Sequence, residues 1–244
     1  MSVPKIIHYC WFGGGKMPRI SEKCIKSWEK YGGDFEIMRH DESNFDFMEN
    51  RYVREAYEAK KWAFVSDYVR LKAVYEYGGV YLDTDVELIK PLKPLIENGG
   101  FMGFERESLI STGLGFAAEK GSPLIGELLR DYDGIPFIKP DGTYDLTPCP
   151  DRNTQTIARL GMDITKQNQT FMGIKFLPQE YLCPMDYYTG KTKITKNTYS
   201  IHHYTASWTT KRTKRTTFIK RIIGVKMYDK LYGRFLHKCK WLEW

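Results

Sequence analysis

No stretch of the sequence is long and apolar enough to form a membrane-spanning helix, which needs about 20 such residues. Residues 1–8 also lack the apolar segment of a secretory leader. We therefore expect a cytoplasmic protein that does not cross a membrane. Cysteine is scarce as well: the five residues have spacings that fit neither a zinc site nor a redox motif, which predicts free thiols.

The sequence does have enough apolar and aromatic residues for one large folded domain. Hydrophobic residues make up 42% of the 244 residues and aromatic residues 15%, which excludes a disordered chain. The net charge of +7 is unevenly placed, because residues 211–244 hold 11 Lys and Arg against two acids and the remainder is close to neutral. We expect a folded body at 1–210 and a basic segment at 211–244.

The basic segment has a helical rhythm of apolar residues between Phe218 and Leu236 and ends in Trp241 and Trp244. This pattern is typical of an amphipathic helix on an anionic membrane surface, where each basic residue contributes about 1 kcal/mol. A helix packed on the body with a solvated cationic face is the alternative. Nucleic acid is not expected as a partner, because the body shows no base-reading module.

Strand and helix patterns alternate along the body and predict an α/β fold with a mixed central sheet and one core. Gly78 and Gly79 end a long helix and lead directly into a strand. The expected strands are 5–11, 35–39, 80–83, 101–104, 113–118 and 199–204, and the expected helices are 21–30, 53–77, 123–132 and 153–160.

Two acids, Asp83 and Asp85, stand at the end of the strand at 80–83. Ligands bind at the carboxyl edge of strands in open α/β sheets. Paired carboxylates suit Mg²⁺ or Mn²⁺, which in turn binds diphosphate oxygens. A lone D-x-D pattern is also explained by a solvated turn. Asp67 and Arg70 favour a site, because they share a face of the preceding helix; a surface ion pair is their simpler interpretation.

Further candidates lie at both ends of the body. His202 and His203 are adjacent on an expected strand, so only one of them can face a site begun by the carboxylates, where imidazole is a suitable ligand. Trp11 and Gly13 follow the first strand, and a Trp ring there suits stacking on a nucleobase. A core Trp beside a tight turn is the alternative.

Three blocks of the sequence resemble the D-x-D sugar-binding glycosyltransferases of glycosyltransferase family 32, the group of bacterial capsule enzymes and fungal initiating mannosyltransferases. The block at 4–14 looks like the opening of these enzymes, and the block at 63–85 matches their central signature almost throughout. The block at 202–208 is similar to their C-terminal H-x-x-x-x-S-W element. The large clostridial glucosylating toxins share the three blocks in more distant form.

The resemblance implies a GT-A fold that binds a nucleotide-sugar donor. It implies that Trp11 stacks on the base and that Asp67 and Arg70 hold the donor sugar and diphosphate region. It also implies that Asp83 contacts the ribose or sugar, or reaches the metal through water, and that Asp85 ligates the metal directly. The remaining implied residues are Gly13 and Tyr81 beside the donor, His202 as a metal ligand with His203 as second choice, and Ser207 and Trp208 over the diphosphate.

The resulting prediction is a metal-dependent, retaining hexosyltransferase. Mn²⁺ or Mg²⁺ is the expected metal, and a UDP-sugar is the expected donor, with a GDP-sugar in second place. The acceptor is a glycan or lipid-linked sugar in capsule or exopolysaccharide assembly, at the inner face of a membrane that the basic segment contacts. Residues outside the shared blocks that are expected to line the acceptor side are Glu105, Asn153 and Gln155.

Two other function classes remain open at this point. A non-catalytic sugar- or membrane-binding adaptor could keep the fold, although intact Asp83, Asp85 and Arg70 argue against it. Residues 82–86 also fit the D-x-D-x-[TV] motif of haloacid-dehalogenase-type phosphatases. In those enzymes the motif strand lies near the start of the domain, whereas about 80 residues precede it in this sequence.

Overall fold

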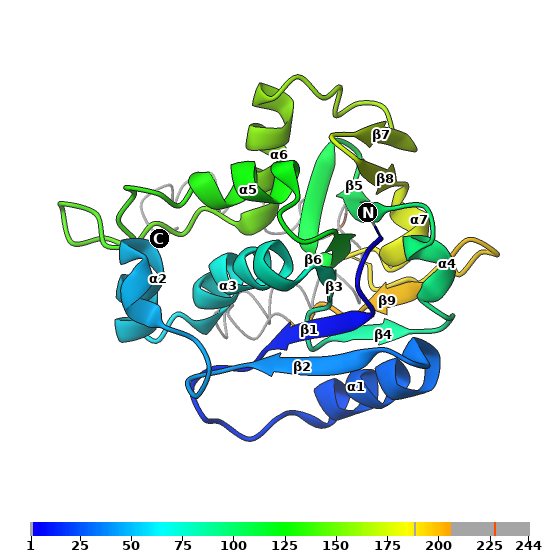
Figure 1. Ribbon diagram of the computed structural model, residues 1–244, viewed down its shortest axis with the longest axis horizontal. Coiled ribbons are helices and arrows are strands. Elements are labelled where there is room, and N and C mark those ends of the chain that lie inside the picture. The colour runs from blue at the N-terminus through cyan, green and yellow to red at the C-terminus, as the bar shows by residue number, and fades with distance from the viewer. Residues whose placement is uncertain (1, 188, 206–226, 228–244) are drawn as a thin grey trace.

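The fold is defined by a computed structural model, which describes residues 2–187, 189–205 and 227 (Figure 1). The described residues do not include Ser207 or Trp208. Of the basic segment at 211–244, they include only Met227. The helix and the membrane surface predicted for that segment therefore stay predictions. Within the described residues, no helix combines the length and the apolar character that crossing a membrane requires.

A seven-stranded mixed sheet forms the centre of the described chain, as the sequence predicts. Its strands are β1 (Ile6–Cys10), β2 (Glu36–His40), β3 (Gly79–Tyr81), β5 (Gly100–Arg106), β6 (Leu109–Ala118), β7 (Gln169–Phe171) and β8 (Ile174–Leu177). Their order is β2-β1-β3-β6-β5-β8-β7. Strand β1 runs parallel to β2 and β3, and β6 runs antiparallel to β3 and β5. A separate small sheet pairs β4 (Val86–Leu88) with β9 (Ser200–His202) in antiparallel fashion.

Helices pack around the central strands (Figure 1). They are α1 (Arg19–Gly32), α2 (Arg51–Glu58), α3 (Trp62–Tyr77), α4 (Lys93–Ile96), α5 (Pro123–Arg130), α6 (Cys149–Arg159) and α7 (Gln179–Leu182), with a 3-10 turn η1 (Phe47–Glu49) before α2. Helix α3 packs against α2, α5 and the strands β1 and β3, and α6 packs against β6.

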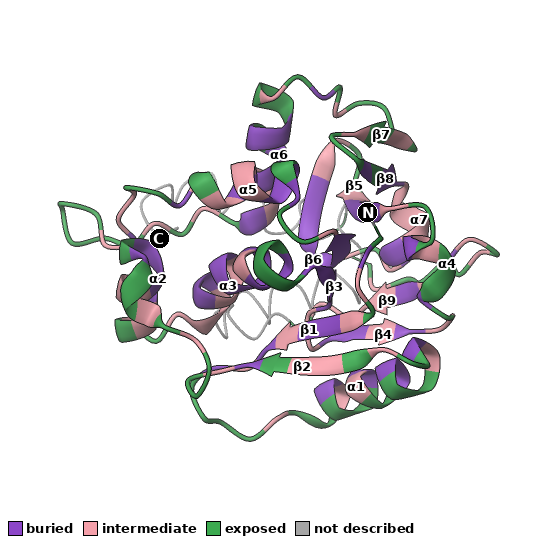
Figure 2. Ribbon diagram, viewed as in Figure 1, coloured by how far each residue is buried: buried purple, intermediate pink, exposed green. Residues whose placement is uncertain are grey.

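The buried residues form two clusters, because side chains alternate between the two faces of each strand. In β3, Val80 packs in the cluster of α1, whereas Tyr81 packs in the cluster of α3 and α5. Phe116 and Ala117 of β6 divide in the same way. Figure 2 shows the buried residues concentrated on β3, β6 and the sheet-facing sides of the helices. The predicted single core is therefore two clusters separated by the sheet.

The prediction of one continuous helix over 53–77 is wrong. Helix α2 ends at Glu58 and α3 begins at Trp62, and between them Lys60 adopts a left-handed backbone with φ of 56°. The backbone N of Lys61 donates to the carbonyl of Ala56, which closes the end of α2. A left-handed residue at a helix end is usually glycine, so the sequence carries no clear signal for this break.

The connection from α3 to β3 brings the helix and the strand close together. Gly79 has φ of 111°, and a Cβ there would lie 2.7 Å from the carbonyl oxygen of Ile6. Only glycine fits such a position. As a result β3 pairs with β1 directly after the helix, and the residues after Tyr81 emerge at the carboxyl end of both strands.

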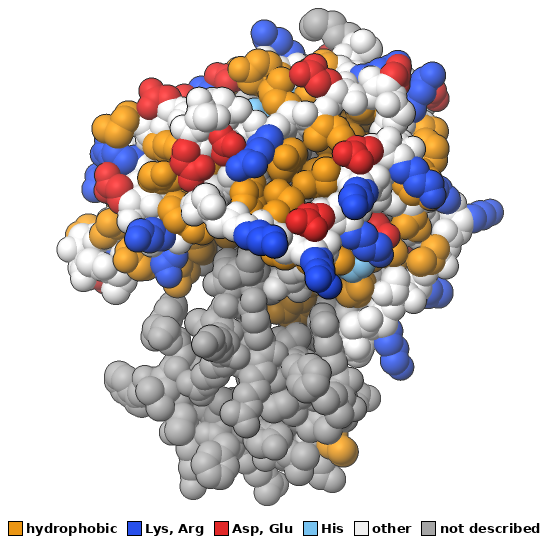
Figure 3. All heavy atoms as spheres, turned by 90° about the horizontal axis from the view of Figure 1, so that it is seen from below, with side chains coloured by type: hydrophobic (Ala, Val, Ile, Leu, Met, Phe, Trp, Pro, Cys, Tyr) orange, Lys and Arg blue, Asp and Glu red, His pale blue; other side chains and the backbone are white. Residues whose placement is uncertain are grey.

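The described surface agrees with a body that is close to neutral. On the face seen in Figure 3, basic and acidic side chains are interspersed among hydrophobic and other ones, and no one sign of charge dominates. The positive charge of the protein is therefore not a property of this face of the body.

Candidate functional site

The two acids of the D-x-D pattern lie in the turn between β3 and β4. The backbone N of Val86 donates to the carbonyl of Asp83 over 2.9 Å, which closes the turn. The side chain of Asp83 is 25% exposed and that of Asp85 is 11% exposed. A solvated turn therefore does not account for this pattern, because buried carboxylates need partners.

Arg70 of α3 is the partner of Asp83. Its Nη2 lies 3.1 Å from Oδ1 of Asp83 and 3.0 Å from Oδ1 of Asp67, and its side chain is 5% exposed. The hydroxyl of Tyr81 donates to the same Oδ1 of Asp83 over 2.8 Å, and the Arg70 guanidinium lies 5.1 Å from the centre of the Tyr81 ring. The structure thus brings these four residues together as a buried network, and a surface ion pair does not describe Asp67 and Arg70.

Residues from β6 and α6 complete this network. Nη1 of Arg70 lies 3.2 Å from Sγ of Cys149 and 3.4 Å from Oγ1 of Thr112. The side-chain amide of Asn153 donates to Oγ1 of Thr112 over 3.0 Å. Within the described part of the chain, Nε of Arg70 and Oδ1 of Asn153 are buried without a hydrogen-bond partner. Sequence reasoning missed Thr112 and Cys149, because no spacing links them to the D-x-D turn.

Gly113 gives Asp83 the space that its carboxylate occupies. A Cβ at this position of β6 would lie 2.7 Å from Oδ2 of Asp83 and 3.5 Å from Nη1 of Arg70. A Cβ essentially never approaches an oxygen to 2.7 Å, whereas 3.5 Å is an ordinary contact, so an alanine would displace the Asp83 carboxylate. This glycine is a third residue of the site, after Thr112 and Cys149, that the sequence pattern does not reveal.

His202 of β9 lies beside Asp85 and Asp83. Its Nε2 is 3.2 Å from Oδ1 of Asp85, and its Nδ1 is buried without a hydrogen-bond partner among the described residues. One ligand atom each from Asp83, Asp85 and His202 can be chosen so that all three lie within 4.8 Å of one another. Two carboxylates and one imidazole at this spacing are a donor set that suits Mn²⁺ or Mg²⁺.

His203 faces away from these three residues. Its Nε2 lies 2.8 Å from Oε2 of Glu87, which also pairs with Lys23 of α1. Its backbone N donates to the carbonyl of Asp85 over 3.0 Å. Because neighbouring residues on a strand point in opposite directions, the structure places His202 at the carboxylates and His203 in a separate ion-pair cluster.

The buried charges of the site shift the pKa values of its residues. Burial raises the pKa of Asp83, and it raises the pKa of Asp67 to about 6 although Arg70 opposes this. Burial acts the same way on Asp85, but the charge of His202 and hydrogen bonds from Thr205 outweigh it and hold the pKa of Asp85 well below its usual range. Burial alone would lower the pKa of His202, whereas the Asp85 carboxylate raises it. Asp85 therefore favours the charged form of His202, and His202 favours the charged form of Asp85.

The loop after β1 carries Trp11 and Gly13. The indole of Trp11 is half-buried, and its Nε1 donates to the carbonyl of Gly15 over 2.8 Å. Gly13 has φ of 86°, and a Cβ there would lie 2.6 Å from the ring of Trp62. The loop is thus packed on the start of α3, and Cys10, the residue before Trp11, is buried in the same cluster as Tyr81.

The residues expected on the acceptor side do not lie together. Asn153 is buried beside Thr112 and belongs to the Arg70 network, as described above. Gln155 is exposed and lines a polar depression with Asp131 and Arg159. Glu105 of β5 is half-buried and is one of the charges that act on His202. Asn153 and Glu105 are therefore near the carboxylate site, whereas Gln155 lies on a different surface.

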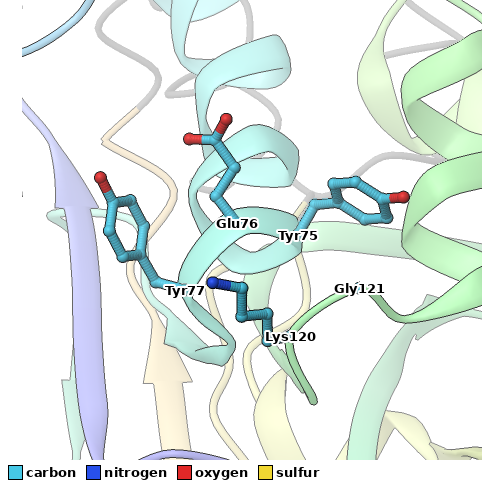
Figure 4. Close-up of a pocket in the computed structure, with 5 residues that line it drawn as sticks. All are labelled: Tyr75, Glu76, Tyr77, Lys120 and Gly121. Atoms are coloured by element: carbon cyan, nitrogen blue, oxygen red, sulfur yellow. The ribbon is translucent and has the colours of Figure 1, made fainter.

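A depression with a greater volume than the one beside Gln155 lies at the C-terminal end of α3. It has a volume of about 490 Å³ and is lined by Tyr75, Glu76, Tyr77, Lys120 and Gly121 (Figure 4). None of the residues at the D-x-D turn contributes to it. The size of this depression does not make it the functional site, because the buried charges and the metal-type donor set lie at the other end of α3.

Residues 18–101 match the family described as the glycosyltransferase sugar-binding region containing a DXD motif. This region includes Asp67, Arg70, Asp83 and Asp85. Residues 18–101 are thus similar to the DXD-containing sugar-binding region of glycosyltransferases, and the resemblance to DXD glycosyltransferases is confirmed.

Two curated relatives come from the fission yeast Schizosaccharomyces pombe. Inositol phosphoceramide mannosyltransferase 3 is 32% identical over 144 residues, which is 56% of this chain and 39% of the relative. Inositol phosphoceramide mannosyltransferase 1 is 27% identical over 137 residues, which is 53% of this chain and 42% of the relative. The chain thus spans about two fifths of the length of these relatives.

Solved structures with a similar arrangement are also glycosyltransferases. The PaToxG glycosyltransferase has a TM-score of 0.48 at 16% identity. The match covers 66% of this chain and 70% of the PaToxG chain. A glycosyltransferase involved in the glycosylation of the major capsid of PBCV-1 has a TM-score of 0.47 at 12% identity, over 90% of this chain and 100% of its own. Both scores are below 0.5, so the GT-A fold stays a proposal for this chain.

Proposed function

We propose that this protein is a metal-dependent glycosyltransferase of GT-A fold that transfers a sugar from a nucleotide-sugar to a glycan or lipid-linked acceptor. The observation that carries the proposal is the grouping of Asp83, Asp85 and His202 within 4.8 Å, next to the buried guanidinium of Arg70. Asp83, Asp85 and Arg70 lie inside the region that matches the DXD family, and His202 joins them from β9, outside that region. A binding adaptor has no need of a metal-type donor set, and the family match favours glycosyl transfer over a phosphatase.

The residues present fit a divalent cation. Asp85 and His202 supply a carboxylate and an imidazole, Asp83 supplies a second carboxylate, and the buried Nδ1 of His202 has no partner among the described residues. When bound, Mn²⁺ or Mg²⁺ would offset the negative charge that develops on the departing diphosphate. His202 would bind the ion through a ring nitrogen of its neutral imidazole.

Arg70 acts on the donor through its fixed charge. Asp67 and Asp83 both contact Nη2 of its guanidinium, at 3.0 Å and 3.1 Å, which fixes the position of the charge before a donor arrives. A preorganised cation of this kind stabilises negative charge without reorganisation. Asp67 and Tyr81 orient Arg70 and Asp83, and Trp11 with Gly13 supplies the surface for the base. Ser207 and Trp208 are proposed to close over the diphosphate.

The donor and acceptor follow from the sequence prediction and the relatives. A UDP-sugar is the first candidate donor and a GDP-sugar the second. The two yeast relatives are named as inositol phosphoceramide mannosyltransferases, which favours a mannose donor and a lipid acceptor among the candidates. We keep retention of configuration, a role in capsule or exopolysaccharide assembly, and membrane contact through 211–244 as parts of the proposal.

The proposed function is tested by measuring hydrolysis and transfer with a panel of UDP- and GDP-sugars, in the presence of Mn²⁺ and after its removal with a chelator. The expected result is sugar release from one donor that stops without metal and returns when Mn²⁺ is restored. Release of phosphate from simple phosphate esters, with no activity on any nucleotide-sugar, would contradict the proposal and favour the phosphatase alternative.

A further inference from the structure

The carboxylate of Asp85 has two oxygens with different surroundings. Oδ1 faces Nε2 of His202 at 3.2 Å. Oδ2 accepts two hydrogen bonds from Thr205, one from the backbone N and one from Oγ1, each 2.8 Å long. Oδ2 is held by the two donors of Thr205, whereas the partner of Oδ1 is His202, itself a proposed ligand, so Oδ1 is the oxygen of Asp85 that can bind a metal together with His202.

Thr205 reaches Asp85 from the other end of the body through a tight turn after β9. Tyr204 adopts a left-handed backbone with φ of 49°, which is uncommon for a residue with a side chain. Its ring lies 4.3 Å from the ring of His202, and its hydroxyl lies 2.8 Å from Sγ of Cys183. These contacts hold the unfavourable backbone in place, and the turn directs both donors of Thr205 at one oxygen. Unfavourable backbone conformations of this kind concentrate at functional sites.

The same segment is also tied to Asp85 through the main chain. The backbone N of His203 donates to the carbonyl of Asp85 over 3.0 Å, next to the β4–β9 pair of Val86 and His202. Asp85 therefore holds the 202–205 segment by its carbonyl and by its carboxylate. In return, the segment restricts the rotation of the Asp85 side chain.

We propose that Thr205 is a positioning residue for the metal: it fixes the Asp85 carboxylate so that Oδ1 and His202 are presented together. This inference rests on the metal site of the proposed function and adds a residue outside the DXD region. Hydrogen bonds to a ligating carboxylate set its orientation, and losing one typically costs about 10–100-fold in metal affinity. The backbone N of Thr205 remains in any substitution, so the lower end of that range is expected for loss of the hydroxyl.

The test is a titration of the whole 244-residue chain with Mn²⁺ alone. Electron paramagnetic resonance measures the concentration of free Mn²⁺ at each step. Thr205→Val, which removes the hydroxyl and keeps the branched shape, should weaken Mn²⁺ binding by about tenfold. Thr205→Ser, which keeps the hydroxyl, should restore binding to within about twofold of the wild type. Thr165→Val is the matched control, because Thr165 also donates from its N and Oγ1 to one aspartate oxygen, that of Asp163 on an exposed turn.

Two outcomes separate this inference from the proposed function. If Asp85→Asn abolishes Mn²⁺ binding but Thr205→Val binds like the wild type, Thr205 has no positioning role and the metal site stands. If Asp85→Asn and the wild type bind Mn²⁺ equally, or neither binds it, both proposals are overturned. A purely structural role for Thr205 would lower the melting temperature of both Thr205 variants and leave the Mn²⁺ affinity of the folded protein unchanged.

Discussion

Nη2 of Arg70 lies 3.1 Å from Oδ1 of Asp83, and this contact joins helix α3 to the turn after β3. The same Nη2 lies 3.0 Å from Asp67, so one buried guanidinium compensates two buried carboxylates. Removing the charge leaves both carboxylates without a counter-ion in a site that excludes most water. The cost of such a loss exceeds that of any exposed ion pair on this protein.

Arg70→Met is therefore expected to lower the free energy of unfolding by about 3 kcal/mol or more. Arg159→Met is the control, because the pair of Arg159 with Asp131 has an arginine that is 68% exposed. That substitution should cost less than about 1 kcal/mol. Urea unfolding of both variants measures the difference, and equal costs would show that the Arg70 network does not stabilise the fold.

Gly113→Ala tests the close approach of β6 to Asp83. The backbone of Gly113 does not require glycine, so its effect comes from the added methyl group, which would lie 2.7 Å from Oδ2 of Asp83. Overpacking of this kind lowers the free energy of unfolding by about 1–3 kcal/mol. Because the methyl group displaces the Asp83 carboxylate, we also expect nucleotide to bind about tenfold more weakly in the presence of Mn²⁺.

Gly126→Ala in α5 is the control for this substitution. Its Cβ would lie 3.1 Å from the ring of Tyr75, which is 38% exposed and free to shift. Isothermal titration of both variants should show wild-type affinity for Gly126→Ala and weak binding for Gly113→Ala. Unchanged binding in Gly113→Ala would mean that the position of Asp83 is not critical for the donor.

Local features of this site could be predicted from the sequence, whereas its long-range contacts could not. Asp83 and Asp85 follow an apolar strand, and Asp67 and Arg70 are three residues apart on the helix before it, so spacing places each pair on one edge or face. The contact of Arg70 with Asp83, which joins the two pairs, is seen only in the structure. The contacts of Arg70 with Thr112 and Cys149 depend on how β6 and α6 pack against α3. Hydrophobic periodicity holds no information about such packing.

Two further differences have the same origin. The break between α2 and α3 depends on a left-handed Lys60, which is a conformation that lysine seldom adopts and no pattern predicts. The engagement of Asp85 by Thr205 joins residues 120 positions apart, and it depends on a strained turn at Tyr204. The D-x-D pattern indicates the chemistry of the site, but the tertiary fold determines which oxygen is available for it.

The free energy of unfolding should depend on pH through a buried pair of histidines that are not part of the carboxylate site. Nδ1 of His8 lies 3.0 Å from Nε2 of His40, and Nε2 of His8 lies 2.8 Å from the carbonyl of Gly78. The Gly78 carbonyl accepts a hydrogen bond from Nε2–H of His8. Burial lowers the pKa of His8, and the neutral His8 ring accepts at Nδ1 a hydrogen bond from Nε2–H of His40. Burial, with a smaller effect from His8, lowers the pKa of His40 to about 4 from 6.5.

A lowered pKa means that the unfolded chain binds a proton that the folded chain does not. The contribution of His40 to the free energy of unfolding is therefore complete above pH 6.5 and declines as the pH falls toward about 4. Between about pH 7 and pH 5 we expect a loss of about 2 kcal/mol, measured by urea unfolding. His40→Gln, whose amide can still donate to His8, should remove most of this loss. An identical pH dependence in the variant would contradict the assignment.

Deletion of residues 211–244 tests the predicted role of the basic segment. The truncated protein should no longer sediment with anionic vesicles, because the segment holds 11 basic residues against two acids. Metal-dependent hydrolysis of the donor should remain, because Asp83, Asp85, Arg70 and His202 all lie in the body. If hydrolysis is lost together with vesicle binding, the segment is part of the folded core.

The central claim is that Asp85 holds a metal that in turn binds a nucleotide diphosphate. The most direct measurement is calorimetric titration of the wild type and Asp85→Ala with UDP and then GDP, each with and without Mn²⁺. The account predicts that one nucleotide binds the wild type only when Mn²⁺ is present and does not bind Asp85→Ala, which still unfolds cooperatively. Nucleotide binding that is independent of Mn²⁺ and unchanged in Asp85→Ala, or no nucleotide binding under any condition, would contradict it.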